Sequence, residues 1–351
     1  MATNKENLHW LKTLYPGYFA LTMSTGIISV GFDIIEMPKI SDVVGYIAIF
    51  SWITFAVLYM MRLALFKNAF VSDLLNPKLT FNFFTFIAAT CLIGLIFFIH
   101  KFYNISIAFW LISAVAWIAL LYCSFGVLTI FHREKTVNIV DGRWLICIVG
   151  TEALVLLGVK IIDHVGTYAP LFVIGTYMLW GIGIMLYAIF VTLFSYRIFF
   201  LDMRAEDYTP QMWVVMGAAA ICANAGSGLE MATPVIDALY EVHAVIEGVA
   251  LLAWAWATWW IPLLVIIGFW RHFSKNIPIT YDPRQWSIVF PLGMYTVASH
   301  QLSLAAEYAP LHEVSHVMIW ITVFVWCLLI AALFRRILGR LFRPVRKIDV
   351  A

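Results

Sequence analysis

The sequence predicts an all-α integral membrane protein with ten transmembrane helices, arranged as five tandem helical hairpins. Of its 351 residues, 63% are hydrophobic and only 12% are charged, a balance outside the range of soluble domains. Apolar runs recur that are long enough to cross a hydrocarbon core of about 30 Å. These runs are continuously apolar rather than alternating, which excludes a transmembrane β-barrel.

Ten apolar runs define the expected helices. They lie near residues 17–33, 42–66, 81–100, 104–131, 144–162, 167–196, 211–229, 238–269, 285–304 and 311–334. The loops are short, so we expect a single transmembrane domain over residues 1–351, with a short N-terminus of about residues 1–15 and a basic tail of about residues 335–351. No GxxxxGKS or GxxxxGKT motif occurs, which argues against an ATP-driven pump.

The basic residues are distributed unevenly over the loops. All of the 22 Lys and Arg fall on one side of the predicted membrane except Lys39, Lys101 and Lys160. Because basic loops stay in the cytoplasm, we predict a multi-pass protein of the cytoplasmic membrane with both termini in the cytoplasm. The expected partner of its surface is the lipid bilayer, and nothing in the charge pattern indicates nucleic acid.

A repeat accompanies the helices. Five apolar segments begin with an aromatic residue, at Phe19, Phe84, Trp144, Trp213 and Trp286, with about 60 to 73 residues between neighbours. Small residues follow in each segment: Gly26, Ala88 with Ala89, Gly150, Gly217 and Gly293. Each repeat holds two spans, so the five leading helices cross in the same direction. Like-oriented copies can surround an axis along the membrane normal, which predicts a pore and hence transport.

The odd-numbered helices are rich in Gly, Ala, Ser and Thr, whereas the even-numbered ones are bulky. Small residues permit close approach of helices and bulky aliphatic residues face lipid well. We infer an inner ring of odd helices and an outer ring of even ones. The alternative, that the small residues mark only tight helix packing, stays open at this stage.

The ninth predicted helix contains a proline next to a large aromatic residue. Pro291 removes a helix hydrogen bond and Gly293 loosens the following turn, so a kink is expected just after Phe290. Such a kink can place the Phe290 ring across a pore. The alternative is that Phe290 is one of 27 phenylalanines and simply packs.

Several segments together resemble the tellurite-resistance/dicarboxylate transporter family, which includes bacterial TehA, the yeast malate permease and the plant slow-type anion channels. They are YPGYFALTMSTGI, YRIFF followed by TPQMWVVMGAAAI, WAWATWWIPLL with WRH, and WSIVFPLGMYTVA. The resemblance covers nearly the whole chain. It implies five hairpins with the odd helices around a central pore, a homotrimer, and a pore gate at Phe290 with Pro291 and Gly293 beside it.

The expected pore lining comes from the odd helices. Its candidates are Phe19, Thr22, Ser24, Thr25, Gly26, Phe84, Thr85, Ala88, Trp144, Gly150, Thr151, Trp213, Gly217, Asn224, Trp286 and Thr296. No Lys or Arg lies at mid-depth on an odd helix, so anion preference would come from hydroxyl groups and helix backbone amides.

Glu152 departs from the neutral polar residue expected at its place in the fifth helix. An ionisable group at this depth is a functional hypothesis. Glu152 is therefore our candidate for coupling proton movement to anion movement. The alternative is a permanently neutral carboxyl that hydrogen-bonds to a neighbouring helix.

A competing motif occurs at the start of the tenth helix. His312, Glu313 and His316 form H-E-x-x-H, which on a helix can bind zinc with the Glu as a general base. It lies outside the inferred pore ring, so a membrane zinc metalloenzyme is the alternative function. The favoured prediction is cofactor-free transport of a small anion, with or without protons. The resemblance suggests malate or another four-carbon dicarboxylate, or chloride or nitrate.

Overall fold

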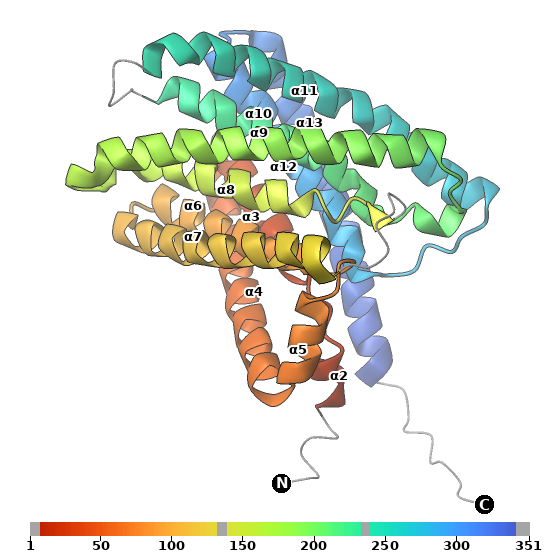
Figure 1. Ribbon diagram of the computed structural model, residues 1–351. Coiled ribbons are helices and arrows are strands. Elements are labelled where there is room, and N and C mark those ends of the chain that lie inside the picture. The colour runs from red at the N-terminus through yellow and green to blue at the C-terminus, as the bar shows by residue number, and fades with distance from the viewer. Residues whose placement is uncertain (1–7, 132–138, 233–238, 342–351) are drawn as a thin grey trace, which may run out of the picture.

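The computed structural model describes residues 8–131, 139–232 and 239–341, and its secondary structure there is helical throughout (Figure 1). This confirms the predicted all-α class. The leading helices are α3 (Phe19–Ile34), α6 (Phe84–Ile99), α8 (Ile146–Ile161), α10 (Val214–Met231) and α12 (Trp286–Ala305). The helices that follow them are α4 (Pro38–Leu65), α7 (Tyr103–Gly126), α9 (Ala169–Phe200), α11 (Tyr240–Phe269) and α13 (Ala309–Leu341).

Shorter helical segments join these ten helices. They are α2 (His9–Lys12), α5 (Lys67–Leu74), the 3₁₀ turns η1 (Thr80–Phe83), η4 (Ile162–His164), η5 (Gly166–Tyr168), η6 (Ala205–Asp207), η7 (Pro210–Trp213) and η10 (Pro283–Gln285), and the π-helical η2 (Val127–Phe131) and η9 (Trp270–Ser274). Helices α2 and α5 lie where we expected only termini or loops. Each predicted span overlaps one long helix, although the range 238–269 begins at a residue outside the described part.

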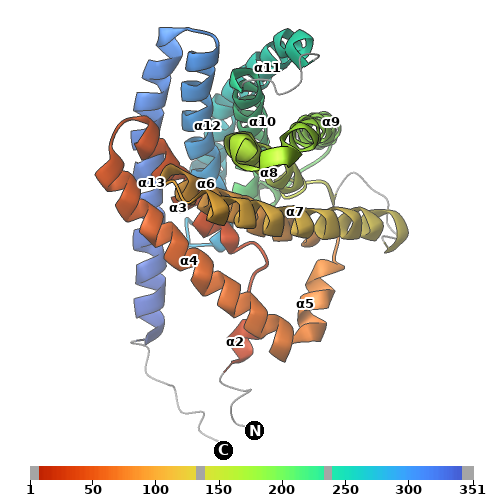
Figure 2. The same ribbon diagram turned by 90° about the vertical axis from the view of Figure 1, so that its left-hand side faces the viewer.

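The five leading helices contact one another in a closed order. Helix α3 packs against α6, α6 against α8, α8 against α10, α10 against α12, and α12 against α3. We call these the ring helices, and the other five long helices the outer helices. Each outer helix packs on the ring helix that precedes it in the sequence. Figure 2 shows α13 beside α12 and α3, where the last repeat meets the first.

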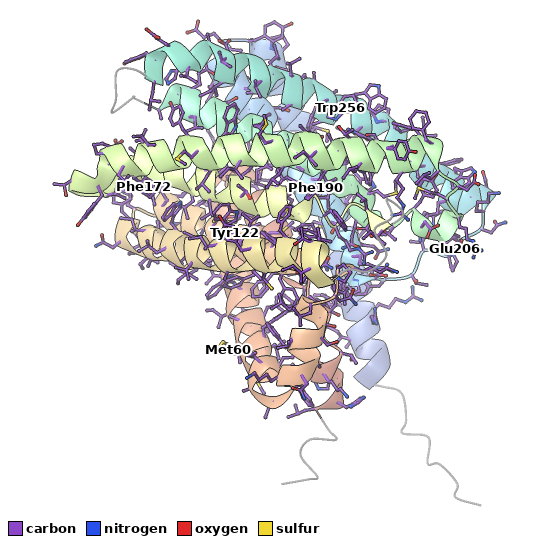
Figure 3. All side chains as sticks on the ribbon, in the orientation of Figure 1. Met60, Tyr122, Phe172, Phe190, Glu206 and Trp256 are labelled. Atoms are coloured by element: carbon purple, nitrogen blue, oxygen red, sulfur yellow. The ribbon has the colours of Figure 1, made fainter. Side chains whose placement is uncertain are left out.

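Burial separates the two groups of helices. In its most apolar stretch, the ring segment Pro210–Met231 is 89% buried, whereas the outer segment Pro38–Leu65 is 17% buried. Large apolar side chains project from the outer helices, as Figure 3 shows for Met60, Tyr122 and Trp256. An apolar surface of this kind suits lipid rather than water.

Seven helical segments of the described residues are long and apolar enough to cross a membrane. They are Pro38–Leu65, Thr80–Ile99, Tyr103–Ile130, Gly166–Phe200, Pro210–Met231, Tyr240–Ser274 and Ala309–Gly339. We expected ten such segments. Helices α3 and α8 have only 16 residues each, and α12 carries Ser, His and Gln side chains. Helices enclosed by other helices face little lipid, so they need less length and less hydropathy.

A repeated hydrogen bond ties each outer helix to the next ring helix. The indole N–H groups donate from Trp52 to Thr90 Oγ1 (3.0 Å), from Trp117 to Thr151 Oγ1 (2.8 Å), from Trp180 to the Cys222 carbonyl (3.2 Å), from Trp254 to Ser299 Oγ (2.9 Å) and from Trp326 to Thr25 Oγ1 (3.1 Å). The last of these joins α13 to α3 and so links the two ends of the chain. In an apolar surrounding, an indole N–H without an acceptor is unfavourable.

We expect Trp52→Phe, Trp117→Phe, Trp254→Phe and Trp326→Phe together to lower the free energy of unfolding by about 2 kcal/mol. Interhelical hydrogen bonds in membrane proteins contribute about 0.6 kcal/mol each, and separated sites add. Unfolding in mixed micelles would measure the loss. Trp259→Phe is the control, because the Trp259 indole makes no hydrogen bond to the described residues. An equal loss for the four-site variant and the control would contradict the prediction.

Candidate functional site

A cavity of about 440 Å³ lies within the ring, at the end where the ring helices finish. All five ring helices contribute to its wall, through Ile27, Val30, Asp33 and Ile34 (α3), Leu95, Phe98 and Ile99 (α6), Leu156, Val159 and Lys160 (α8), Asn224 and Gly228 (α10), and Val297 and Gln301 (α12). Lys101 and Tyr103, which follow α6, complete it. We call this space the axial cavity, its end of the ring the far end, and the end where the ring helices begin the lead end.

A narrow void adjoins the axial cavity, and Phe290 is part of its wall. The void, without room for a water molecule, is lined by Phe290 together with Ala88, Cys91, Leu92, Leu95, Ala153, Leu156, Ile221 and Met294. Leu95 and Leu156 line both spaces, so the void adjoins the cavity. The Phe290 side chain is 1% exposed. The wall of the void is therefore made of apolar side chains.

Close packing holds the backbone around Phe290. Helix α12 continues through Pro291 without a break, so the expected kink does not interrupt it. A Cβ added at Gly217 of α10 would lie 2.7 Å from Pro291 Cγ, and one added at Gly293 would lie 2.6 Å from Ile27 Cγ2 of α3. Both glycines thus allow α12 to approach its ring neighbours. Two further glycines that we predicted to line the pore also allow ring helices to approach each other. A Cβ added at Gly26 of α3 would lie 3.2 Å from Leu92 of α6, and one added at Gly150 of α8 would lie 3.1 Å from Phe84 of α6.

The hydroxyl groups expected to line a pore are instead used between and within helices. The following donate to backbone carbonyls: Ser24 to Trp286, Thr25 to Leu21, Thr85 to Asn82, Thr151 to Cys147 and Thr296 to Leu292. Thr22 shares a hydrogen bond with Ser51 of α4. Of the candidates, Ala88 lines the void and Asn224 lines the cavity. In this state the hydroxyls have no free hydrogen for an anion.

The five leading aromatic residues line neither the axial cavity nor the void. Phe19 contacts Phe55, Tyr59 and Phe86. Phe84 and Trp144 both contact Phe81. The Trp286 indole donates to Tyr281 Oη, and Trp213 lies in η7 with its side chain partly exposed. The repeat of aromatic residues therefore marks where each hairpin packs against neighbouring segments, and it does not mark the residues that line the cavity.

Glu152 is fully buried but does not line the axial cavity or the void. Its carboxyl fits against Gly183 of the outer helix α9, where an added Cβ would collide with Oε1. The Cys222 thiol of α10 lies 3.8 Å from the same oxygen, and Oε2 has no hydrogen-bond partner among the described residues. Our expectation that Glu152 faces the pathway is not met by this placement, since its neighbours in α8 (Ala153 and Leu156) occupy the axis.

Charged residues at the far end were missed as site residues. Lys160, Lys101 and Asp33 line the axial cavity. The sequence analysis treats Lys101 and Lys160 only as markers of topology, because their positions at the ends of predicted spans do not show that they share a cavity. Gln301 and Tyr103 are further polar groups of the wall that the sequence did not single out.

At the lead end, polar side chains from separate repeats meet. Tyr15 Oη donates to Asn82 Oδ1 (2.7 Å), and Gln211 Nε2 donates to both of these oxygens (2.7 and 3.0 Å). Gly142 lies directly on the backbone of Gln211. Burial raises the pKa of the Tyr15 phenol above its usual value. We call Tyr15, Asn82 and Gln211 the lead-end network.

Two arginines flank this network, each paired with the aspartate two residues earlier. Arg143 Nε binds both carboxylate oxygens of Asp141 (2.9 and 2.7 Å), and Arg284 Nε binds those of Asp282 (3.0 and 2.9 Å). Burial alone would raise the pKa of Asp282, but the hydrogen bonds and charge of Arg284 hold it below its usual value. Both guanidinium groups are thus neutralised locally.

The H-E-x-x-H motif lies at the start of α13, in the outer layer. His312 Nε2 and His316 Nε2 are 2.9 Å apart, and the His300 ring is near His312, whereas Glu313 is exposed. No group of three or more His, Cys, Asp or Glu suited to a metal occurs in the described part of the chain.

Long apolar helices around an axial cavity indicate a multi-pass membrane protein of the transport class. The sequence profile of the voltage-dependent anion channel family (SLAC1) matches residues 13–334, and the chain belongs to this family. This is a transport family and not a family of enzymes, and the match confirms the predicted resemblance.

Relatives agree with this assignment. Two uncharacterized transporters of Methanocaldococcus jannaschii are 24% and 22% identical to the chain, over 92% and 95% of its length and 93% and 98% of theirs. An uncharacterized membrane protein of Mycobacterium tuberculosis is 33% identical over 153 residues, which cover 43% of this chain and 76% of the relative.

We expect Gly142→Ala to reduce the melting temperature markedly, because its Cβ would collide with the Gln211 carbonyl of the backbone that carries the lead-end network. Gly126→Ala is the matched control. No atom lies within 4 Å of a Cβ at Gly126 in α7, and alanine is favoured over glycine in a helix by up to about 1 kcal/mol. In thermal unfolding in detergent, the melting temperature should therefore fall for Gly142→Ala and rise for Gly126→Ala. Equal shifts of the melting temperature in the two variants would disprove the packing at Gly142.

Proposed function

We propose that this protein moves small anions across the cytoplasmic membrane along the axis of the ring, with Phe290 as the gate. The observation that carries the proposal is the axial cavity, which all five ring helices line, together with the adjoining void that the buried Phe290 helps to line. In the closed state the void at this ring is too narrow for water, and an apolar constriction of that size blocks an ion. Displacement of one side chain would widen the narrowest point.

All ten long helices cross the membrane in this proposal, with the lead end and both termini in the cytoplasm. The positive-inside distribution supports this orientation, since only Lys39, Lys101 and Lys160 belong to the far end. Helix α2 and the C-terminal end of α13 lie on the same side of the molecule (Figures 1 and 2), as an even number of crossings requires.

The pathway has two closures in series. From the far end, an anion enters the axial cavity and meets Phe290. Beyond Phe290, the lead-end network of Tyr15, Asn82 and Gln211 joins three of the five repeats by hydrogen bonds. Opening needs the aromatic ring to rotate away and these hydrogen bonds to give way. The family resemblance suggests malate or another four-carbon dicarboxylate, chloride or nitrate as the permeant, and a homotrimer as the assembly.

We expect Phe290→Ala to raise anion flux into proteoliposomes by at least about tenfold, because the variant removes an aromatic ring that lines the void. Malate and chloride would each be offered with and without a pH gradient. Phe190→Ala is the matched control, because it removes a buried aromatic ring from the outer helix α9 (Figure 3). The Phe190 ring contacts Trp144. An increase in both variants would indicate loosened packing, and no flux in any variant would refute the proposed function.

Glu152 remains our candidate for coupling proton movement to anion movement. In this proposal its protonation changes how α8 packs on α9 and α10, and the carboxyl does not face the anion. We expect Glu152→Gln to remove the effect of a pH gradient on flux. Gly183→Ala should act similarly, because its Cβ would displace the carboxyl, whereas a Cβ at Gly181 meets no atom within 4 Å and that variant should behave as wild type. Flux that keeps its full pH dependence in Glu152→Gln would exclude this role.

A further inference from the structure

An apolar groove lies on the outer surface of the molecule at the lead end. It has a volume of about 350 Å³ and is formed by the end of α11 with η9, by η7 and by the start of α12. Leu264 of α11, Met212 of η7 and Ile288 of α12 are among its apolar lining residues. Val265 and Phe269, which also line it, are more than half exposed, so the groove opens on the surface. We call it the α11 groove.

The α11 groove extends from the apolar part of α11 to an aromatic and charged end. Tyr208 and Trp213 line it, and the Trp270 ring packs edge-on against Tyr208, with the ring centroids 5.5 Å apart. Trp and Tyr are enriched where a membrane meets water. From Leu264 to Arg271 the helix rises by about 10 Å. In the proposed orientation, the groove therefore runs from the hydrocarbon region of the cytoplasmic leaflet to the level of its headgroups.

Arg271 supplies a positive charge at the headgroup end of the groove. Among the described residues that line the groove, it alone has a permanent charge. No carboxylate oxygen of the described residues lies within 4.0 Å of its guanidinium, and its buried Nε has no hydrogen-bond partner there. Asp282 and Glu206 are near enough to interact electrostatically, but the Asp282 carboxylate is bound by Arg284. A buried N–H of a charged group without an acceptor is unfavourable, so Arg271 has capacity for an anionic ligand.

The neighbouring histidine does not supply the missing negative charge. His272 Nδ1 lies 2.7 Å from the Ile277 carbonyl oxygen, which can only accept, so Nδ1 carries the hydrogen. His272 Nε2 can then accept from Arg271 Nη1, at the long distance of 3.5 Å. An imidazole has no negative charge, and this contact leaves the charge of Arg271 uncompensated.

We propose that the α11 groove binds an anionic phospholipid of the cytoplasmic leaflet, with an acyl chain on the apolar lining and the phosphate on Arg271. Three observations point to this occupant. The groove opens on the side of an outer helix, its lining is apolar over the length of α11, and its one permanent charge is a guanidinium, which binds phosphate oxygens in pairs. Basic side chains attract anionic lipids at the cytoplasmic surface. The inference rests on the proposed function for the orientation in the membrane only.

The test is native mass spectrometry of the purified full-length protein in detergent, titrated with phosphatidylglycerol and, separately, with phosphatidylcholine of the same acyl chains. We expect wild type to bind phosphatidylglycerol more tightly. Arg271→Gln should weaken phosphatidylglycerol binding by at least about fivefold, because one basic residue at an anionic headgroup is lost. Arg271→Lys should lie in between, since an ammonium keeps the charge but cannot bind two phosphate oxygens as a fork. Lys78→Gln, exposed at the lead end but outside the groove, should bind as wild type.

Gly268→Leu tests the apolar part of the groove. Gly268 lines the groove and a Cβ there meets no atom within 4 Å, so the leucine side chain has room to occupy it. Leucine also favours a helix over glycine, so the melting temperature should stay equal or rise. Binding of both lipids should weaken. Gly248→Leu is the matched control, because it lies in the same helix outside the groove and also meets no atom within 4 Å.

Three results would overturn the lipid site. The first is equal affinity of wild type for the two lipids, or unchanged phosphatidylglycerol affinity in both Arg271→Gln and Gly268→Leu. The second is displacement of phosphatidylglycerol by an equal concentration of glycerol 3-phosphate, which would assign the groove to a soluble phosphate. The third is loss of an oligomer in Gly268→Leu with lipid binding unchanged, which would assign it to a second copy of the chain. Lipid binding is measured without flux, so this inference and the proposed function fail separately.

Discussion

Closure of the ring depends on the contact of α12 with α3. The two helices can approach each other closely because there is very little side chain between them. The absence of a side chain at Gly293 leaves room for Ile27 of α3. At the same junction the Trp326 indole of α13 donates a hydrogen bond to Thr25. Without this closure the other four ring contacts would leave an open sheet of helices and no enclosed axis. The same junction holds the backbone next to Phe290, so the assembly of the repeats and the position of the proposed gate have one physical origin.

Satisfaction of polar groups explains why the hydroxyls do not line the axis. In an apolar surrounding each hydroxyl hydrogen needs an acceptor, and the nearest one is the carbonyl four residues earlier in the same helix. Thr25, Thr151 and Ser299 use that carbonyl and at the same time accept an indole N–H from an outer helix. Both polar capacities are thereby used for structure, which leaves the axis to aliphatic side chains, Phe290 and the charged groups of the far end.

The molecule also separates its charges by depth. At the lead end, Arg143 and Arg284 are each held by a neighbouring aspartate and flank a hydrogen-bonded network. At the far end, Lys101 and Lys160 line the axial cavity and form no ion pair with the described residues. Between them the axis is apolar.

The sequence by itself determined the all-helical class, the repeat of five aromatic-led segments and the family, because hydropathy and the motifs that carry the resemblance are local properties of the chain. It did not determine which side of a ring helix faces the axis. A ring helix is buried against other helices on most of its sides, so its residue pattern does not show which side faces the axis. In the structure Glu152 packs against Gly183 of α9, and Thr25 and Thr151 accept hydrogen bonds from tryptophans of outer helices. Only the tertiary structure decided that Lys101, Lys160 and Asp33, from three separate segments, share a single cavity.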